Sequence, residues 1–150
     1  MNTNASRPKA LARLFDAGLD SIRVSLNSAR EEYYMRYYKP KDYSFKDVVK
    51  SIDMAKGRGV FVSINYLTMP GFTDGEGEYA ALKKFLQGHR IDMIQWRNLN
   101  FDPVRYFRRL NKGNIPLGNE KTIGIKEMVD SIRKEFPKLK TGYFNPPTNF

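Results

Sequence analysis

Apolar residues recur along the chain with two alternating spacings, one typical of helices and one typical of strands. Four segments carry them three or four positions apart and are predicted to be helices: between Ser6 and Gly18, between Ser44 and Gly57, between Asp74 and Gly88, and over residues 123–136. Each of the first three follows a Ser or Asp, residue types that favour the position before a helix. In the first helix, Leu11, Leu14 and Phe15 are expected on the buried face.

Between these helices lie β-rich runs over residues 21–27, 60–67 and 91–99. A short helix is predicted after Asp102 and Pro103. Alternating helices and strands indicate an α/β fold with parallel strands, because each helix carries the chain back to the start of the next strand. Such a sheet is either open and doubly wound or an arc of a barrel. In both arrangements ligands bind at the carboxyl ends of the strands.

The predicted strands are less apolar than parallel strands that are buried on both faces. Successive side chains alternate between faces, so each strand has one apolar face and one face with polar side chains near its end. The polar positions are Arg23, Ser25 and Asn27, then Ser63 and Asn65, then Gln95 and Arg97. In a dry core each unpaired polar group would cost about 2 kcal/mol or more. A solvated open sheet would also accommodate them, but their clustering at strand ends favours a polar ligand.

Composition excludes several kinds of chemistry. The chain has 150 residues and no cysteine, which excludes disulfides, thiol catalysis and cysteine-bound metal. A single histidine, His89, is too few for a histidine-based metal site or triad. No apolar run approaches the roughly 20 residues of a membrane helix. No export signal opens the sequence, so a cytoplasmic location and no membrane partner are expected.

The net charge of +10 raises the question of a nucleic-acid partner. The basic residues are spread along the chain, with short groups at residues 36–41 and 105–109, and the favoured interpretation places them on solvated helix faces. Some alternate with tyrosines, an arrangement that can stack bases and hold phosphates. These are Tyr33, Tyr34, Tyr37, Tyr38 and Tyr43. Packing of a helix after the first strand is the favoured explanation of this cluster, so nucleic acid is a possible partner but not the favoured one.

Several short motifs, in their order and spacing, resemble the radical SAM superfamily. They are Thr3-Asn4, AGLDSIRVSLNS at 17–28, SINY at 63–66, MPGFTD at 69–74, QWRNLN at 95–100 with Asp102-Pro103, and GYFNPP at 142–147. The resemblance implies that residues 1–110 form the later βα units of a partial (βα)6 TIM-like barrel. Residues 111–150 are then a C-terminal helix and tail.

In that superfamily the barrel binds S-adenosylmethionine (SAM) against a [4Fe–4S] cluster. Reduction of the sulfonium gives a 5′-deoxyadenosyl radical, which abstracts a substrate hydrogen. The cluster is held by cysteines spaced C-x3-C-x2-C, and a Gly-Gly-Glu strand end meets the SAM amino group. Neither motif is present here. The resemblance therefore implies a fragment or truncated relative that holds no cluster, is inactive alone, and is completed by the N-terminal part of the same domain.

By position, the resemblance also implies residues that bind SAM. They are Thr3, Asn4, Ser25, Asn27, Asn65 and Arg97. The first four match strand ends that contact the ribose or carboxylate of SAM in relatives, and Asn65 matches a polar residue of the lumen. Arg97 could pair bidentately with a carboxylate of SAM or of the unknown substrate. The alternatives are a frayed terminus for Thr3 and Asn4, turn formation for Ser25 and Asn27, and a structural ion pair for Arg97.

Two further interpretations stay open beside this one. The charge alone is compatible with a basic, non-catalytic α/β module that binds RNA or another polyanion. A barrel arc without its first strands also has an open edge, which predicts self-association.

Overall fold

The computed structural model describes residues 1–111 and 120–142 of the chain. Five parallel strands form a sheet in the order β1-β2-β3-β4-β5, so that neighbours in sequence are also neighbours in space. The strands are β1 (Asn2–Thr3), β2 (Ser21–Leu26), β3 (Phe61–Thr68), β4 (Met93–Asn98) and β5 (Lys140–Thr141). The helices are α1 (Pro8–Asp16), α2 (Glu31–Tyr38), α3 (Phe45–Gly57), α4 (Glu76–His89), α5 (Pro103–Leu110) and α6 (Ile125–Glu135). The prediction of an α/β fold with a parallel sheet is confirmed.

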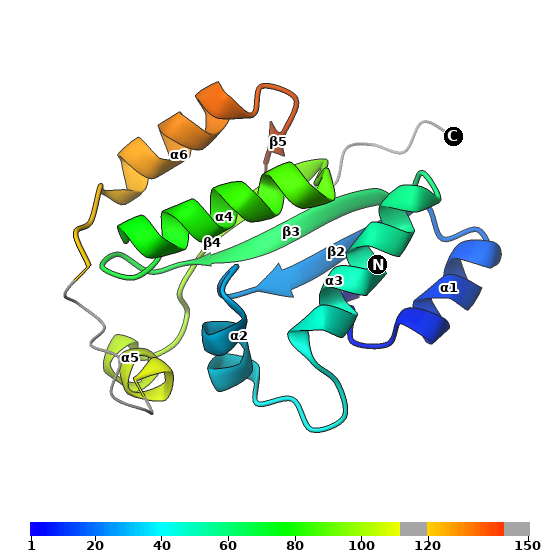
Figure 1. Cartoon of the computed structure of the whole chain (residues 1–150), viewed down its shortest axis with the longest axis horizontal. Helices are drawn as coiled ribbons and strands as arrows, with labels where there is room; N and C mark the ends of the chain where they lie inside the picture. The colour runs from blue at the N-terminus through cyan, green and yellow to red at the C-terminus, as the bar shows by residue number, and fades with distance from the viewer. Residues whose placement is uncertain (112–119, 143–150) are drawn as a thin grey trace.

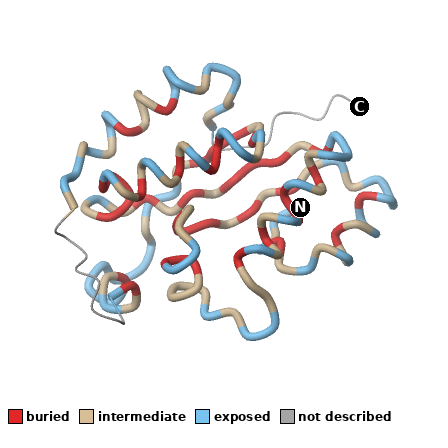
Figure 2. The backbone as a smooth tube through the Cα atoms, viewed as in Figure 1, coloured by how far each residue is buried: buried red, intermediate tan, exposed pale blue. Residues whose placement is uncertain are grey.

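The core lies between one face of the sheet and the helices α1, α3 and α4 (Figure 1). Alternate residues of the three central strands point into it, and Val24, Val62 and Ile64 are fully buried. The helices contribute apolar residues three or four positions apart, such as Val48 and Ile52 of α3. Figure 2 shows the resulting line of buried residues along β2 and β3. Burial of this apolar face fixes the register, because a slip of one residue would turn every side chain to the other face.

Side-chain capping marks the start of only some of the described helices, and the sequence predicted these caps only in part. Ser44 caps α3 in a capping box with Asp47, as its position predicted. Ser6 and Asp74 do not cap helices, which corrects that expectation. The first helix begins one residue later, after Arg7, and Asp74 instead accepts a hydrogen bond from the backbone N–H of Gly71 at 2.7 Å.

Two other differences concern the edges of the fold. Leu14 is 42% exposed rather than buried, because only Leu11 and Phe15 of α1 face the core. The sequence predicted no strand after the last helix, yet β5 pairs in parallel with β4 and extends the sheet. Residues 143–147, most of the last motif named above, lie outside the described residues. No described helix combines the length and apolar character needed to cross a membrane.

The carboxyl ends of the central strands meet at one end of the molecule. In Figure 1 the arrowhead of β2 points toward α2, and α5 lies beside α2 at the same end. The loops that leave β2, β3 and β4 therefore gather where a parallel sheet binds ligands.

Candidate functional site

Polar side chains of three adjacent strands are level on the sheet face opposite the helical core. Ser25 of β2 pairs with Asn65 of β3, and Asn65 pairs with Gln95 of β4. Arg97 lies two residues further along β4, opposite Leu67. The alternation seen in the sequence thus becomes a polar row across the sheet, near its carboxyl edge.

A cavity of about 400 Å³ opens at this edge. Its wall combines side chains of the three strands with two residues from the end of α2 and two from the segment around the end of β4. The lining residues are Ser25, Leu26, Tyr37, Tyr38, Asn65, Leu67, Arg97, Asn98 and Asn100. Pockets that bind small molecules have volumes of about 300–1,000 Å³. The cavity therefore has the size and the mixture of hydroxyl, amide, guanidinium and aromatic groups of a ligand site.

Two amide side chains on the polar face carry acceptors that nothing in the described chain satisfies. The side-chain oxygens of Asn65 and Gln95 are both buried and accept no hydrogen bond from the described residues. Gln95 is 1% exposed, and its side-chain nitrogen donates to the sulfur of Met93 at 3.7 Å. Buried polar groups without partners are rare and usually have a specific explanation. A ligand with N–H or O–H donors would supply the missing partner of Asn65, which lines the cavity.

The six residues expected to bind SAM are divided by the structure into two groups. Ser25, Asn65 and Arg97 line the cavity together. The other three make local contacts and are not among its lining residues. The side chain of Thr3 accepts from the N–H of Ala5 at 3.0 Å, and that of Asn4 accepts from the N–H of Ser6 at 3.2 Å.

Asn27 is fully buried at the start of the loop that leads into α2. Its side-chain nitrogen donates to the carbonyl oxygen of Tyr33 at 3.2 Å. This contact holds the first turn of α2 against the end of β2, and so helps to place the helix whose last residues line the cavity.

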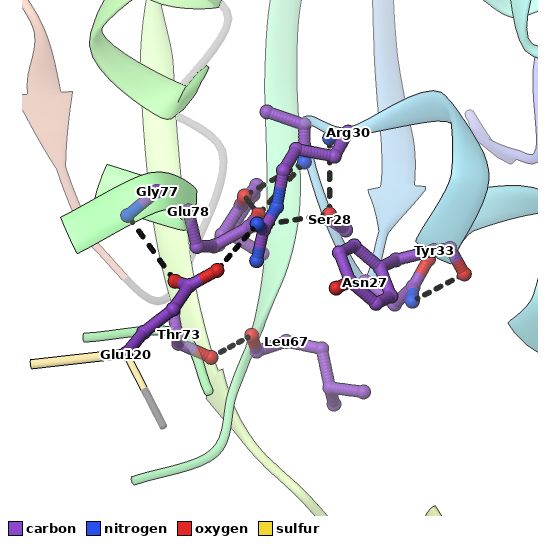
Figure 3. A network of polar contacts seen from close by, with 11 residues as sticks. Asn27, Ser28, Arg30, Tyr33, Leu67, Thr73, Gly77, Glu78 and Glu120 are labelled. Carbon is purple, nitrogen blue, oxygen red and sulfur yellow. Dashed lines mark hydrogen bonds and ion pairs between the residues drawn. The ribbon is translucent and has the colours of Figure 1, made fainter. Parts of the chain in front are cut away.

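A second polar cluster fixes the same loop from the other side (Figure 3). The carboxylate of Glu78, in the first turn of α4, is fully buried. It accepts hydrogen bonds from the hydroxyl of Ser28 at 2.7 Å, from the N–H of Ala29 at 2.9 Å, and from Nε of Arg30 at 2.9 Å. The hydroxyl of Tyr66, on β3, also donates to it. These bonds join α4 and β3 to the loop between β2 and α2.

Arg30 extends this cluster to the segment before α6. Its Nη1 donates to Glu120 at 2.9 Å, and the N–H of Gly77 donates to the other oxygen of Glu120 at 3.2 Å. Burial disfavours the charged form of Arg30 and would lower its pKa. The hydrogen bonds and negative charges of Glu120 and Glu78 have the opposite effect and are stronger, so the pKa of Arg30 is raised. Burial beside Glu78 likewise raises the pKa of Tyr66 well above its usual value. Both groups therefore keep their protons at neutral pH.

Sequence reasoning missed this cluster and part of the cavity wall. Glu78 lies in the opening turn of a predicted helix, where the helix dipole favours any carboxylate, and no local pattern distinguishes it from the exposed Glu76. The bonding partners of Glu78 are 12 to 50 residues away in the sequence. Asn98 and Asn100 were visible as part of a motif but received no role.

Comparison with known proteins bears directly on this arrangement. The family model of the radical SAM superfamily matches residues 1–82, more than half of the chain. The chain belongs to the radical SAM superfamily. No curated protein matches it.

The radical SAM match covers β1 to β3 and the start of α4, and with them Ser25 and Asn65. It does not reach Arg97, α5 or the rest of the C-terminal region. The superfamily implies SAM and a [4Fe–4S] cluster in the parent protein. The 150 residues contain no cysteine, so they do not supply the thiolates that such a cluster needs. The donors at the cavity fit SAM better, because a hydroxyl, an amide and a guanidinium can bind ribose hydroxyls and a carboxylate.

Proposed function

We propose that this chain is the later, substrate-side part of a radical SAM domain and that its cavity binds SAM. The five-stranded sheet would form the later arc of a partial (βα)6 barrel, with earlier strands pairing along the outer edge of β1. The cluster ligands would come from that earlier part of the domain. SAM and the cluster together supply radical chemistry, and the residues described here bind, orient and shield the ligand.

The observation that carries the proposal is the row of polar side chains at the cavity. Ser25 and Asn65 belong to the superfamily match, are level with each other, and face the same cavity as Arg97. The buried oxygen of Asn65 has no partner among the described residues. A ligand with hydroxyl or ammonium donors and a carboxylate could donate to Asn65 and accept hydrogen bonds from Arg97.

The chain alone can be tested for binding without any cluster. SAM titrated into the purified chain is expected to give a measurable heat by calorimetry. Arg97→Ala should weaken binding about tenfold or more, because a hydrogen bond to a charged group contributes about 1.5–3 kcal/mol. Arg133→Ala is the matched control, since Arg133 is exposed on α6 and does not line the cavity, and it should leave the affinity unchanged. Equal losses in both variants would argue against the site.

Catalysis requires a second experiment on a longer protein. The coding sequence in frame upstream of Met1 is expected to encode a C-x3-C-x2-C motif. That longer protein, reconstituted with iron and sulfide and reduced, should release 5′-deoxyadenosine from SAM. If no such motif lies upstream or in a neighbouring gene, the catalytic part of the proposal is wrong.

A further inference from the structure

The structure separates the tyrosines around α2 into two groups with different surroundings. Tyr33 and Tyr34 are buried in the core, with 1% and 0% of their surface exposed. Tyr37 and Tyr38, at the end of α2, line the cavity, and their ring centroids are 4.9 Å apart with nearly perpendicular planes. Burial in the core therefore explains the first pair, whereas the second pair also presents ring surface to the cavity.

One arginine lies against this aromatic wall, and others are on the neighbouring helix and strand. The guanidinium of Arg109, on α5, lies 6.0 Å from the centre of the Tyr37 ring. Arg105 is one helical turn earlier on the same stripe of α5 and is exposed, and Arg97 is exposed where β4 enters the cavity wall. Nη1 of Arg36 donates to the carbonyl oxygen of Leu110 at 2.6 Å, which ties α2 to α5 and fixes the wall against the basic helix.

Acidic groups close to this surface do not cancel its charge. Asp102 lies at the start of α5, where its carboxylate accepts a hydrogen bond from the N–H of Arg105 at 2.7 Å. Glu31 and Glu32 are exposed in the first turn of α2, at the opposite end of that helix from Tyr37. The cavity mouth thus has an excess of positive charge, on a chain whose net charge is +10.

The interior of the cavity adds groups that can form directional hydrogen bonds. Asn98 and Asn100 line it beside Asn65, and an amide side chain offers both a donor and an acceptor. Aromatic rings, amides and arginines are the groups that stack a base, bind its edge and hold the adjoining phosphates. A cavity of about 400 Å³ cannot admit a stretch of duplex. Enzymes that act on a base take it out of its stack into such a pocket.

We infer that the mouth of this cavity binds single-stranded nucleic acid, with one base entering against Tyr37 and Tyr38 and the backbone held by Arg105 and Arg109. This inference rests on the proposed function, because it names the class of substrate presented to the SAM site. The inner end of the cavity, at Ser25 and Asn65, remains the SAM-binding part. The basic residues of α5 would thus bind the nucleic-acid backbone beside the site and would not only contact solvent.

The test is a binding titration of a fluorescein-labelled, single-stranded RNA of twelve nucleotides, followed by anisotropy at several salt concentrations. Binding should weaken as salt rises, because each phosphate contact releases counterions. The double variant Arg105→Gln with Arg109→Gln should lower the slope of log affinity against log salt by about 1.4, at about 0.7 per contact with a single strand. The matched control is Arg133→Gln with Lys134→Gln, which removes the same charge from exposed positions of α6 and should leave the slope unchanged.

A third variant tests the aromatic wall. Tyr37→Leu keeps an apolar side chain but removes the ring, and should weaken the single-stranded RNA about tenfold while leaving heparin binding unchanged. Circular dichroism checks that the variant is folded, and if it is not, the double variant of Arg105 and Arg109 decides the test. Equal losses from both double variants, or equal affinity for a blunt duplex of the same length, would overturn the inference. Calorimetry with SAM is run on the same arginine variant, which should still bind SAM, so that failure of the RNA site and failure of the SAM site are distinguished.

Discussion

Nε of Arg30 lies 2.9 Å from the buried carboxylate of Glu78, so a charged pair joins the loop after β2 to the first turn of α4. The side chain of Glu78 is 0% exposed, and its pairing with Arg30 is supported by a hydroxyl and a backbone N–H from the same loop. Because the loop leads into α2, this pair also sets the position of the aromatic wall of the cavity. Removing one partner would leave the other charge buried and unpaired, which costs free energy. Substitutions in this cluster therefore test the structure sensitively.

Glu78→Gln is expected to destabilise the fold by about 3 kcal/mol or more, since removing one partner of a buried ion pair typically costs about 3–5 kcal/mol. The new amide would also present N–H groups to donors such as Ser28 and Arg30. Urea unfolding followed by circular dichroism measures the change. The control is Glu76→Gln, two residues earlier, whose side chain is 58% exposed and 3.9 Å from Lys121. That control should change the free energy of unfolding by less than about 0.5 kcal/mol, and a comparable loss in both would contradict the burial of Glu78.

Two glycines of α4 provide a matched pair of substitutions to alanine. A Cβ on Gly77 would lie 2.9 Å from Nη1 of Arg30 and 3.0 Å from a carboxylate oxygen of Glu120, whereas a Cβ on Gly88 would meet nothing within 4 Å. Gly88→Ala should therefore stabilise the protein by about 0.5–1 kcal/mol through helix propensity alone. Gly77→Ala should lose this gain, because the side-chain tips of Arg30 and Glu120 must move apart. Equal urea midpoints for the two variants would show that the ion pair near Gly77 is absent in solution.

Asn65→Val should separate ligand binding from stability. The oxygen of Asn65 is buried without a partner among the described residues, so removing it relieves a desolvation cost, and valine suits a strand. We expect the free energy of unfolding without ligand to stay the same or rise by up to about 1 kcal/mol. SAM binding, measured by calorimetry, should weaken. A marked loss of stability without ligand would instead assign Asn65 a structural hydrogen bond.

The capping box of α3 predicts a pH-dependent contribution to stability. Hydrogen bonds from the backbone N–H and the hydroxyl of Ser44, both at 2.9 Å, lower the pKa of Asp47. A carboxylate whose folded pKa lies below its unfolded value of about 3.9 stabilises the protein above that pH, and the contribution is lost as pH falls through the folded pKa. Asp47→Asn should therefore lower the Tm at pH 6 and have a smaller effect near pH 2. The same decrease in Tm at both pH values would exclude the charge of Asp47 as the cause.

No strand among the described residues pairs along the outer edge of β1, which predicts that the 150 residues on their own self-associate. The N–H of Arg23 donates to the carbonyl oxygen of Met1 at 2.8 Å, and the alternation of a parallel ladder then places the N–H of Asn2 on the outer edge. Sedimentation velocity should show a mass that rises with protein concentration. Asn2→Pro removes the outward donor and should shift the distribution toward the monomer. A monomer mass that does not depend on concentration in the unsubstituted chain would contradict the prediction.

Local sequence patterns predicted the three central strands, most of the helices between and after them, and the face on which the polar strand residues lie. These predictions depend on local periodicity: a helix buries every third or fourth residue, and a strand every second residue. Ser25 and Asn65 could be placed in this way because parallel strands that bury one apolar face are held in register. The superfamily resemblance followed from the same strand ends.

Which polar residues contact one another depends on how distant segments of the chain pack together. Asn27 follows Ser25 by two positions, yet it is buried against Tyr33 because the chain turns into α2 at that point. Glu78 and Glu76 have the same sequence character, and only the approach of Arg30 from 48 residues away makes one of them a buried ion. Tyr34 and Tyr37 likewise differ only in which neighbour covers them. Contacts between distant segments depend on how whole helices pack on the sheet, and local sequence patterns do not specify that packing.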